Sequence, residues 1–333
     1  MSDIITPNEQ QDDQQHNIHT NRLQQLSEFI GQAHAVQQIT TLVQTAKRHN
    51  ETAEHILIAG PPGLGKTTLA NLVAQEQESQ IHIILAQSIS KSIDLITILM
   101  RLNERDVLFI DEIHRLPKHI AEILYPAMED HQIHLTSTDE NDQVATHTIP
   151  LKPFTLVGAT TRPGMLPTPL QDRFGLTIIL QFYPIDDLAR IIERDANIMQ
   201  ISGGQDTWNT IAEASRGTPR IAKRLLRRVR DYAQAQHITH ITPDIVRATL
   251  QSLAIHNDGL TQLDIQYLQL LARNGGGPLG IKTIASSLFQ SVELLEVNNE
   301  PILLLRNLII ITPRGRQLTT AGAQYIRQQS TTN

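Results

Sequence analysis

One short stretch, Gly60-Pro-Pro-Gly-Leu-Gly-Lys-Thr67, constrains the fold of this chain more than any other. The apolar run 55–59 precedes it, and the helical run 68–74 follows it. A strand, a glycine-rich loop and a helix in this order are typical of a phosphate-binding P-loop. A Gly-Pro surface turn is the alternative, but it needs neither the strand nor the helix. The stretch therefore predicts an α/β domain built on a buried parallel sheet.

Each residue type in the loop has a use in phosphate binding. Gly63 and Gly65 let backbone N–H groups close around phosphate oxygens, and Lys66 adds a cation for the β- and γ-phosphates. The Thr67 hydroxyl completes the coordination of a magnesium ion, and Thr68 is the next predicted nucleotide contact. The predicted cofactors are thus ATP and Mg2+.

The apolar runs 81–85, 107–110 and 154–158 predict three more strands of the same sheet. The run 107–110 delivers Asp111 and Glu112 to the end of its strand. Two adjacent carboxylates at the end of a buried strand are costly unless they bind a cation or a water molecule. We expect Asp111 to hold magnesium through its water shell and Glu112 to polarise the water that attacks the γ-phosphate.

Two further sites follow in the chain. The strand 154–158 leads to Thr161, whose hydroxyl is placed to orient the attacking water. Arg173 has two interpretations: a surface pair with Asp172, or an arginine that neutralises the charge built up during hydrolysis. Arg220 begins a helix rich in cations, and because the apolar positions 221, 225, 226 and 229 form one face, most of those cations are expected to be solvated.

Beyond Tyr183 the pattern becomes helical. Helices are predicted over 185–199, 206–215, 219–236 and 242–253, with Ser202 and Thr242 as polar caps. Farther on, the runs 302–305 and 308–311 predict the two strands of a wing joined at Arg306-Asn307. The predicted domains are a mobile tail over 1–22, a large ATPase domain over 23–183, a small helical lid over 184–255 and a winged-helix domain over 256–333.

Composition narrows the surroundings and the partners. The 333 residues carry a net charge of -6 and no cysteine, and no apolar run reaches the length of a membrane span, so we expect a cytoplasmic protein with no membrane partner. A role on nucleic acid would need locally concentrated charge. Residues 301–333 supply it, with four arginines, no lysine and no acidic residue, a local charge of +4.

Taken together, these residues resemble the RuvB family, AAA+ motors of bacterial Holliday-junction branch migration. The resemblance runs from about residue 22 to 327. Beyond the general AAA+ motifs, it rests on Asp111-Glu-Ile-His-Arg-Leu116, Leu124-Tyr-Pro-Ala-Met-Glu-Asp130, Gly158-Ala-Thr-Thr-Arg162, Arg216-Gly-Thr-Pro-Arg-Ile221, Leu225-Leu-Arg-Arg-Val-Arg-Asp231, Gly276-Gly-Pro278 and Thr312-Pro-Arg-Gly-Arg316.

The resemblance implies a role for further residues. Thr161 corresponds to the sensor 1 hydroxyl, Arg173 to an arginine acting on the neighbouring subunit, and Arg220 to the sensor 2 arginine. The remaining nucleotide contacts that it implies are Arg22, Glu129, Asp130, His131 and Tyr183. Arg314 and Arg316 correspond to arginines that bind DNA.

The implied function is an ATP-dependent motor, a hexameric ring that moves duplex DNA at Holliday junctions during recombination and repair. The implied partners are a RuvA-like junction-binding protein and a RuvC-like resolvase. Two alternatives stay open: a nucleotide-gated AAA+ scaffold on DNA, and an ATPase of the clamp-loader or initiator type. Glu112 and Arg173 disfavour the first, and the strings at 276–278 and 312–316 disfavour the second.

Three departures from the family pattern concern surfaces that meet partners. Leu23 follows Arg22 where the family has proline, which removes a rigid turn. The hairpin expected to dock RuvA is polar over 136–142, where the family is apolar. Ile311 and Val292 occupy positions of two family arginines that contact DNA phosphates, so the affinity for DNA and its salt dependence are expected to be lower.

Overall fold

The computed structural model describes residues 23–138 and 144–331. The chain divides into two compact units, and the boundary between them in the sequence falls between Gln181 and Phe182. The predicted tail and Arg22 lie outside the described residues. None of the helices in the described ranges is long and apolar enough to cross a membrane.

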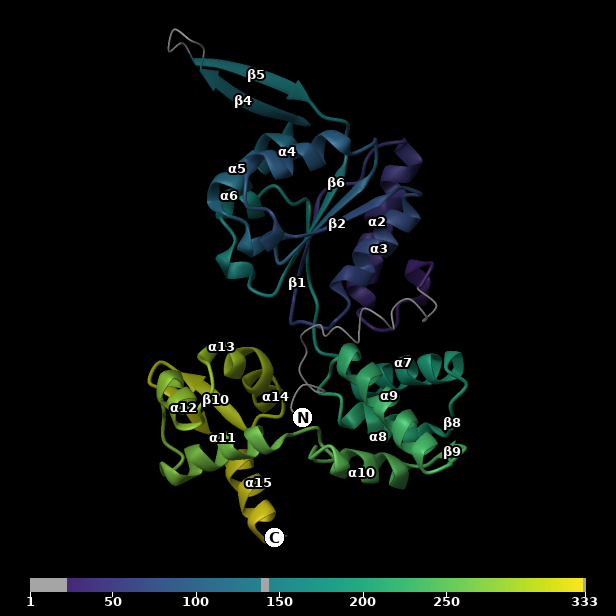
Figure 1. Cartoon of the computed structure of the whole chain (residues 1–333), viewed down its shortest axis with the longest axis vertical. Coiled ribbons are helices and arrows are strands. Elements are labelled where there is room, and N and C mark those ends of the chain that lie inside the picture. Colours follow the sequence, from purple (N-terminus) through teal and green to yellow (C-terminus); the bar gives the residue numbers. More distant parts are fainter. Residues whose placement is uncertain (1–22, 139–143, 332–333) are drawn as a thin grey trace. The chain divides into compact units, whose positions relative to one another are not determined.

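The first unit is built on a five-stranded parallel sheet with the order β2-β3-β6-β1-β7 (Figure 1). Its strands are β1 (Ile56–Ala59), β2 (Ile81–Leu85), β3 (Val107–Asp111), β6 (Thr155–Thr160) and β7 (Leu176–Ile179). Four of them confirm the predicted strands. The fifth, β7, was not predicted because Leu-Thr-Ile-Ile is too short to separate strand from helix by its pattern.

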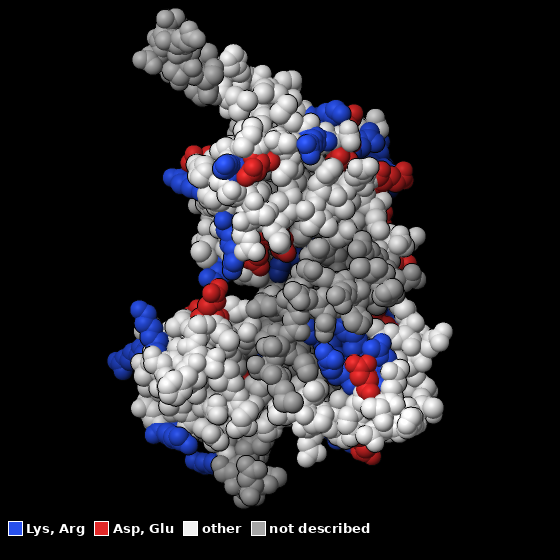
Figure 2. All heavy atoms as spheres, viewed as in Figure 1, with Lys and Arg blue, Asp and Glu red and all other residues white. Residues whose placement is uncertain are grey.

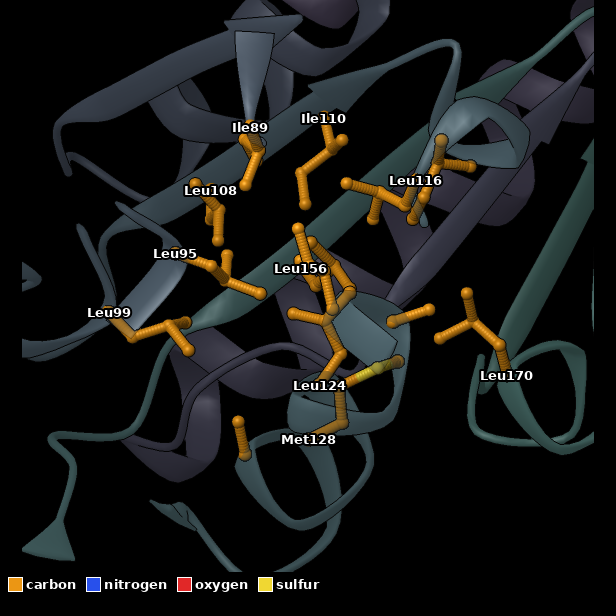
Figure 3. Packing of buried hydrophobic residues seen from close by; sticks show 14 of the residues in the cluster. Ile89, Leu95, Leu99, Leu108, Ile110, Leu116, Leu124, Met128, Leu156 and Leu170 are labelled. Carbon is orange, nitrogen blue, oxygen red and sulfur yellow. The ribbon is translucent and has the colours of Figure 1, made fainter. Parts of the chain in front are cut away.

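Helices cover both faces of this sheet, as Figure 1 shows. They are α2 (Ala33–His49), α3 (Lys66–Glu76), α4 (Ser92–Arg101), α5 (Lys118–Glu129) and α6 (Thr168–Gln171), with short 3-10 turns at Leu26–Glu28, Ala86–Ser88, Ile113–Arg115 and Pro163–Met165. Alternate residues of β3 and β6 pack against α4 and α5 in one apolar cluster (Figure 3). Leu108, Leu124 and Leu156 in this cluster are fully buried, so the strand ends that follow are held on a rigid support.

A two-stranded antiparallel hairpin projects from the first unit (Figure 1). It consists of β4 (Gln132–Thr138) and β5 (Val144–Pro150), and Gln132 pairs with Pro150 at its base. Ile133 near the base is buried in the main core. This hairpin is the segment expected to meet a partner, and its tip, 139–143, lies outside the described residues.

The second unit begins with a helical bundle. Its elements are α7 (Ile185–Ile198), α8 (Gln205–Glu213), α9 (Pro219–Ala235) and α10 (Pro243–Ser252), with the two-residue strands β8 (Ser202–Gly203) and β9 (His240–Ile241). The four predicted helices are confirmed. Of the two predicted caps, Thr242 is the N-cap residue of α10, although its side chain makes no capping hydrogen bond. Ser202 is not a cap, because it pairs with His240 in a strand and Gly204 is the N-cap residue of α8.

A winged-helix fold completes the second unit. It comprises α11 (Gln262–Arg273), α12 (Ile281–Ser287), α13 (Val292–Leu294), a π-turn (Leu295–Asn299), α14 (Glu300–Leu305), β10 (Ile309–Thr312), β11 (Gly315–Leu318) and α15 (Thr320–Thr331). The predicted wing was wrong in its first strand. Residues 302–305 are helical, because Pro301 opens α14 and Leu303 packs in the core of this domain, and the wing is instead β10 paired with β11.

A buried ion pair joins the helical bundle to the winged helix. Arg216, with φ of 53°, donates to the carbonyl oxygens of Gly259 at 2.7 Å and Asn298 at 3.0 Å. Its guanidinium also pairs with the fully buried carboxylate of Asp264. Asp264 in turn accepts from the backbone N–H of Thr261, the N-cap residue of α11. Two domains that the sequence separates therefore share one polar core.

Candidate active site

The P-loop has the geometry that its sequence predicts. Gly60, Gly63 and Gly65 have φ of 148°, 80° and 103°, a region that residues with a Cβ rarely adopt. A Cβ at Gly60 would lie 2.9 Å from the carbonyl oxygen of Leu180, so the close approach of the residue that follows β7 also requires glycine there. Gly65 then becomes the N-cap of α3.

The loop fits a phosphate group. The buried Lys66 is the first residue of α3, and its ammonium donates to the carbonyl oxygens of Gly60 at 2.9 Å and Pro61 at 3.0 Å. The cation is therefore centred inside the loop, where the N–H groups of the helix terminus also favour an anion. Thr67 and Thr68 follow on the first turn of α3, and both residues are exposed.

The second group of predicted residues meets the loop at the carboxyl edge of the sheet. The backbone N–H of Gly60 donates to the carbonyl oxygen of Thr160 at 3.0 Å, so the end of β6 lies beside the loop. The Thr161 hydroxyl donates to Glu112 Oε2 at 2.9 Å. Asp111 ends β3, and its Oδ1 accepts from the Glu112 N–H at 2.9 Å. The predicted base and sensor hydroxyl are thus in direct contact.

A histidine that the sequence did not single out completes this group. The side chain of His114 is buried, and its Nδ1 lies 2.9 Å from Thr160 Oγ1 and 3.2 Å from Glu112 Oε2. Burial lowers the pKa of His114, the carboxylate of Glu112 opposes this, and Arg115, Arg162 and Lys66 add to the lowering. His114 therefore connects Glu112 to Thr160, the residue at the end of β6 whose carbonyl oxygen binds the P-loop.

Arg173 and Glu129 lie at the other edge of the sheet. Glu129 follows Met128, whose carbonyl oxygen is 3.0 Å from His55 Nε2, directly before β1. Arg173 comes three residues before Leu176, which pairs with Ile56 at the start of β1. The P-loop follows the end of β1, so roughly 15 Å of extended backbone separates the two places.

At this edge the two side chains bind each other. Arg173 Nε and a terminal nitrogen donate to Glu129 Oε2 at 3.1 and 2.7 Å, and its guanidinium lies 4.8 Å from the ring centre of Tyr125. Both side chains keep exposed surface, 26% for Arg173 and 61% for Glu129. The alternative pair with Asp172 is not what the structure forms. Asp130 and His131 continue from Glu129 on the same edge.

Two predicted nucleotide contacts belong to the second unit. Tyr183 is buried, and its N–H donates to the carbonyl oxygen of Gly217 at 2.9 Å. Gly217 directly precedes α9, on whose first turn Arg220 lies. Figure 2 shows Lys and Arg side chains gathered over α9, with an acidic side chain among them. The apolar face of α9 is buried as predicted, but Arg224 is buried with it.

The two predicted DNA-binding arginines have different surroundings. Arg314 is exposed in the turn of the wing. Arg316 points inward: its Nε donates to Glu300 Oε1 at 2.7 Å and a terminal nitrogen donates to Glu296 Oε1 at 3.2 Å. The hydrogen bond to Glu300 raises the pKa of Arg316, opposing its desolvation. Ile311, at the position of a family arginine, is half exposed.

The order of these parts defines the class of protein: the chain is a AAA+ P-loop ATPase with a helical lid and a winged-helix domain. Consecutive segments match three family models: the Holliday junction DNA helicase RuvB P-loop domain over 21–180, the RuvB AAA lid domain over 183–256 and the RuvB C-terminal winged helix domain over 257–327. The chain therefore belongs to the RuvB family, whose members are ATP-driven motors of branch migration.

Solved structures agree with this assignment. The Thermotoga maritima RuvB Holliday junction branch migration motor is 40% identical, with 92% of this chain and 98% of that chain covered and a TM-score of 0.82. Two single-substitution forms of Thermotoga maritima RuvB match at 40% and 41% identity, both with a TM-score of 0.83. Each covers 92% of this chain, and 99% and 98% of its own length is matched.

Proposed function

We propose that this chain hydrolyses ATP between neighbouring subunits of a hexameric ring and uses the turnover to pull duplex DNA through Holliday junctions. One observation carries the proposal: Arg173 and Glu129 lie at the amino edge of the sheet, whereas the P-loop lies at the carboxyl edge. The guanidinium of Arg173 has a whole strand between it and the phosphates of its own subunit. Arg173 can therefore act on nucleotide bound to the P-loop of a neighbouring subunit.

Within one subunit, the carboxyl edge holds the hydrolytic groups. Lys66 binds the β- and γ-phosphates, while Thr67 and Asp111 hold Mg2+, which supplies charge neutralisation on the phosphates. Glu112 accepts the proton of the attacking water, and Thr161 orients that carboxylate through the hydrogen bond at 2.9 Å. A purely nucleotide-gated scaffold would have no use for this bonded pair.

The neighbouring subunit supplies the rest of the site in this proposal. Arg173 stabilises the charge on the γ-phosphoryl oxygens, a contribution worth about 10³ to 10⁵ in kcat for arginines of this kind. Glu129, Asp130 and His131 approach the nucleotide along with it. From the second unit, Arg220 and Tyr183 complete the nucleotide contacts.

DNA and protein partners follow from the outer surfaces. Arg314 at the tip of the wing contacts a DNA phosphate, and the acidic stretch 292–305, with three glutamates and no lysine or arginine, stays off the DNA. The hairpin of β4 and β5 docks a RuvA-like protein through polar groups, and a RuvC-like resolvase acts on the same junction. The protein works in the cytoplasm.

Complementation between two inactive variants tests the shared site. Glu112→Gln removes the base, and Arg173→Ala removes the arginine that acts in trans. In a random 1:1 mixture, about a quarter of the sites pair an intact Glu112 with an intact Arg173 of the next subunit. ATPase activity with duplex DNA should therefore reappear on mixing, while each variant alone stays inactive.

Arg48→Ala, an exposed arginine on α2, is the matched control and should retain parental turnover. If mixing restores nothing although the variants assemble together, Arg173 acts within its own subunit and the shared site is refuted. A parent with no ATP turnover above the background of Glu112→Gln would instead refute the hydrolytic assignment and favour a scaffold.

A further inference from the structure

His114 lies inside the catalytic cluster although the mechanism above gives it no task. It belongs to the 3-10 turn Ile113–Arg115 that follows β3, and its side chain is only 4% exposed. Its Nδ1 lies between two oxygens from different strand ends, Thr160 Oγ1 at 2.9 Å and Glu112 Oε2 at 3.2 Å. The ring therefore bridges the base to the end of β6.

The chemistry of the neighbours assigns the proton of this ring. An ionised carboxylate only accepts hydrogen bonds, so a ring nitrogen 3.2 Å from Glu112 Oε2 must carry hydrogen. Thr160 Oγ1 accepts a hydrogen bond from the Arg162 N–H at 3.0 Å, and it can accept a second one from Nδ1–H of His114. Burial holds the pKa of His114 below its usual value, so the ring is neutral with its proton on Nδ1.

We propose that His114 is a positioning residue for Glu112, on the basis of the hydrolytic role proposed for that glutamate. Nδ1 of His114 lies 3.2 Å from Oε2, and the hydroxyl of Thr161 donates to the same oxygen at 2.9 Å. The hydrogen bond from Thr161 and the close contact with His114 fall on one oxygen and restrict the rotation of the carboxylate. Within the described residues, no hydrogen bond is formed with Oε1. Oε1 is thus the oxygen presented to the attacking water.

The backbone makes such support necessary. Glu112 has φ of 51°, in the left-handed region where a residue with a Cβ is strained. Its side chain leaves a turn, not a regular strand, and it keeps 31% of its surface exposed. Without the contact with His114, the carboxylate would sample more rotamers, and the fraction placed for proton transfer would fall.

Two substitutions separate positioning from space filling. His114→Asn keeps an N–H donor near the place of Nδ1, whereas His114→Leu keeps apolar bulk and removes the donor. We expect His114→Leu to lower kcat for ATP by about tenfold to a hundredfold, the range for losing a polar contact with a charged group, with KM changed less than about twofold. His114→Asn should recover most of kcat.

Equal loss in both variants, or a loss carried by KM, would show that the ring only fills space. Parental kcat in His114→Leu would refute the proposal outright. If His114→Leu does not fold, as judged by its thermal transition, Thr160→Val serves instead. Its hydroxyl forms the one hydrogen bond of the ring found in the described residues, so without it the ring loses its fixed place beside Glu112. We expect kcat to fall with KM unchanged; parental kcat would then refute the positioning role.

A double-mutant cycle with Glu112→Gln keeps this inference apart from the function on which it rests. If His114 acts through Glu112, His114→Leu should add nothing further in the Glu112→Gln background. Full activity of Glu112→Gln alone would overturn the assigned base. Loss in Glu112→Gln combined with an additive effect of His114→Leu would leave the base intact and overturn only the positioning role.

Discussion

Arg216→Ala is expected to destabilise the second unit strongly. The guanidinium is 5% exposed, and it binds Asp264 together with the carbonyl oxygens of Gly259 and Asn298. Alanine leaves the Asp264 carboxylate buried with its cation removed, and it leaves two carbonyl groups without their donor. The polar core between lid and winged helix is then only partly satisfied.

The magnitude follows from burial. Breaking a buried ion pair by removing one partner costs about 3 to 5 kcal/mol, because a buried charge is left uncompensated. Asp264 retains the Thr261 N–H at 2.7 Å and an Asn299 amide donor at 2.6 Å, which places the expected loss toward the lower end. Backbone strain does not enter, since both arginine and alanine carry a Cβ at a φ of 53°.

Trp208 provides the assay. It is the only tryptophan of the chain, and it is buried in α8, which ends three residues before Arg216. Urea unfolding followed by its fluorescence therefore reports on this unit. The matched control is Arg247→Ala, whose ion pair with Asp244 at 2.7 Å is exposed and should contribute less than about 1 kcal/mol.

If Arg216→Ala lowers the free energy of unfolding as little as the control does, the stabilising role of the buried ion pair is refuted. It would mean that lid and winged helix are held by apolar contacts and that the buried pair contributes nothing net. Unfolding in two separate steps only in Arg216→Ala would also support this role, because the lid and the winged helix would then no longer unfold together.

Three further outcomes are expected. Arg314→Ala should weaken DNA binding similarly for all sequences and reduce the salt slope of binding by about 1, measured by fluorescence anisotropy. Arg316→Ala should mainly lower the urea midpoint for unfolding of the second unit, followed by Trp208 fluorescence. Phe289→Gly should stabilise the second unit by about 1 kcal/mol, because this 93% exposed phenylalanine sits at a φ of 54°; Asn307→Gly, at a φ of 53°, should gain less, since asparagine tolerates that region. Burial lowers the pKa of His55 from 6.5 to about 4, so the free energy of unfolding of the first unit is highest above pH 6.5 and falls by about 3 kcal/mol between pH 6.5 and 4. Hydrogen exchange of the first unit should show this dependence on pH in the parent and not in His55→Gln.

Sequence periodicity predicted most of the fold, and its failures have local causes. Continuous apolar runs such as 107–110 are buried on both faces and admit one interpretation. The run 302–305 does not, because four apolar residues suit a strand or a buried helix equally, and only packing of Leu303 against the rest of its domain decides for helix. Ser202 resembled a cap, but its partner is His240, 38 residues away.

The site was predictable where one residue type has one use. Lys66, Asp111 and Glu112 follow from the demands of phosphate chemistry. His114 and Arg216 were not singled out, since a histidine in a loop and an arginine before a glycine have many uses. Their roles depend on contacts with Thr160 and Asp264, which lie 46 and 48 positions away in sequence.

The two edges of the central sheet explain why assembly and catalysis are inseparable in the proposed motor. A carboxyl edge that binds nucleotide and an amino edge that presents Arg173 are different surfaces of one subunit, so the contact between them is head to tail. Repeated contacts of this kind either close into a ring or extend into a filament. Every closed contact completes one site, whereas an isolated subunit has none. A lone chain is thus expected to bind ATP but turn it over slowly, and DNA that promotes ring closure stimulates hydrolysis without touching the P-loop.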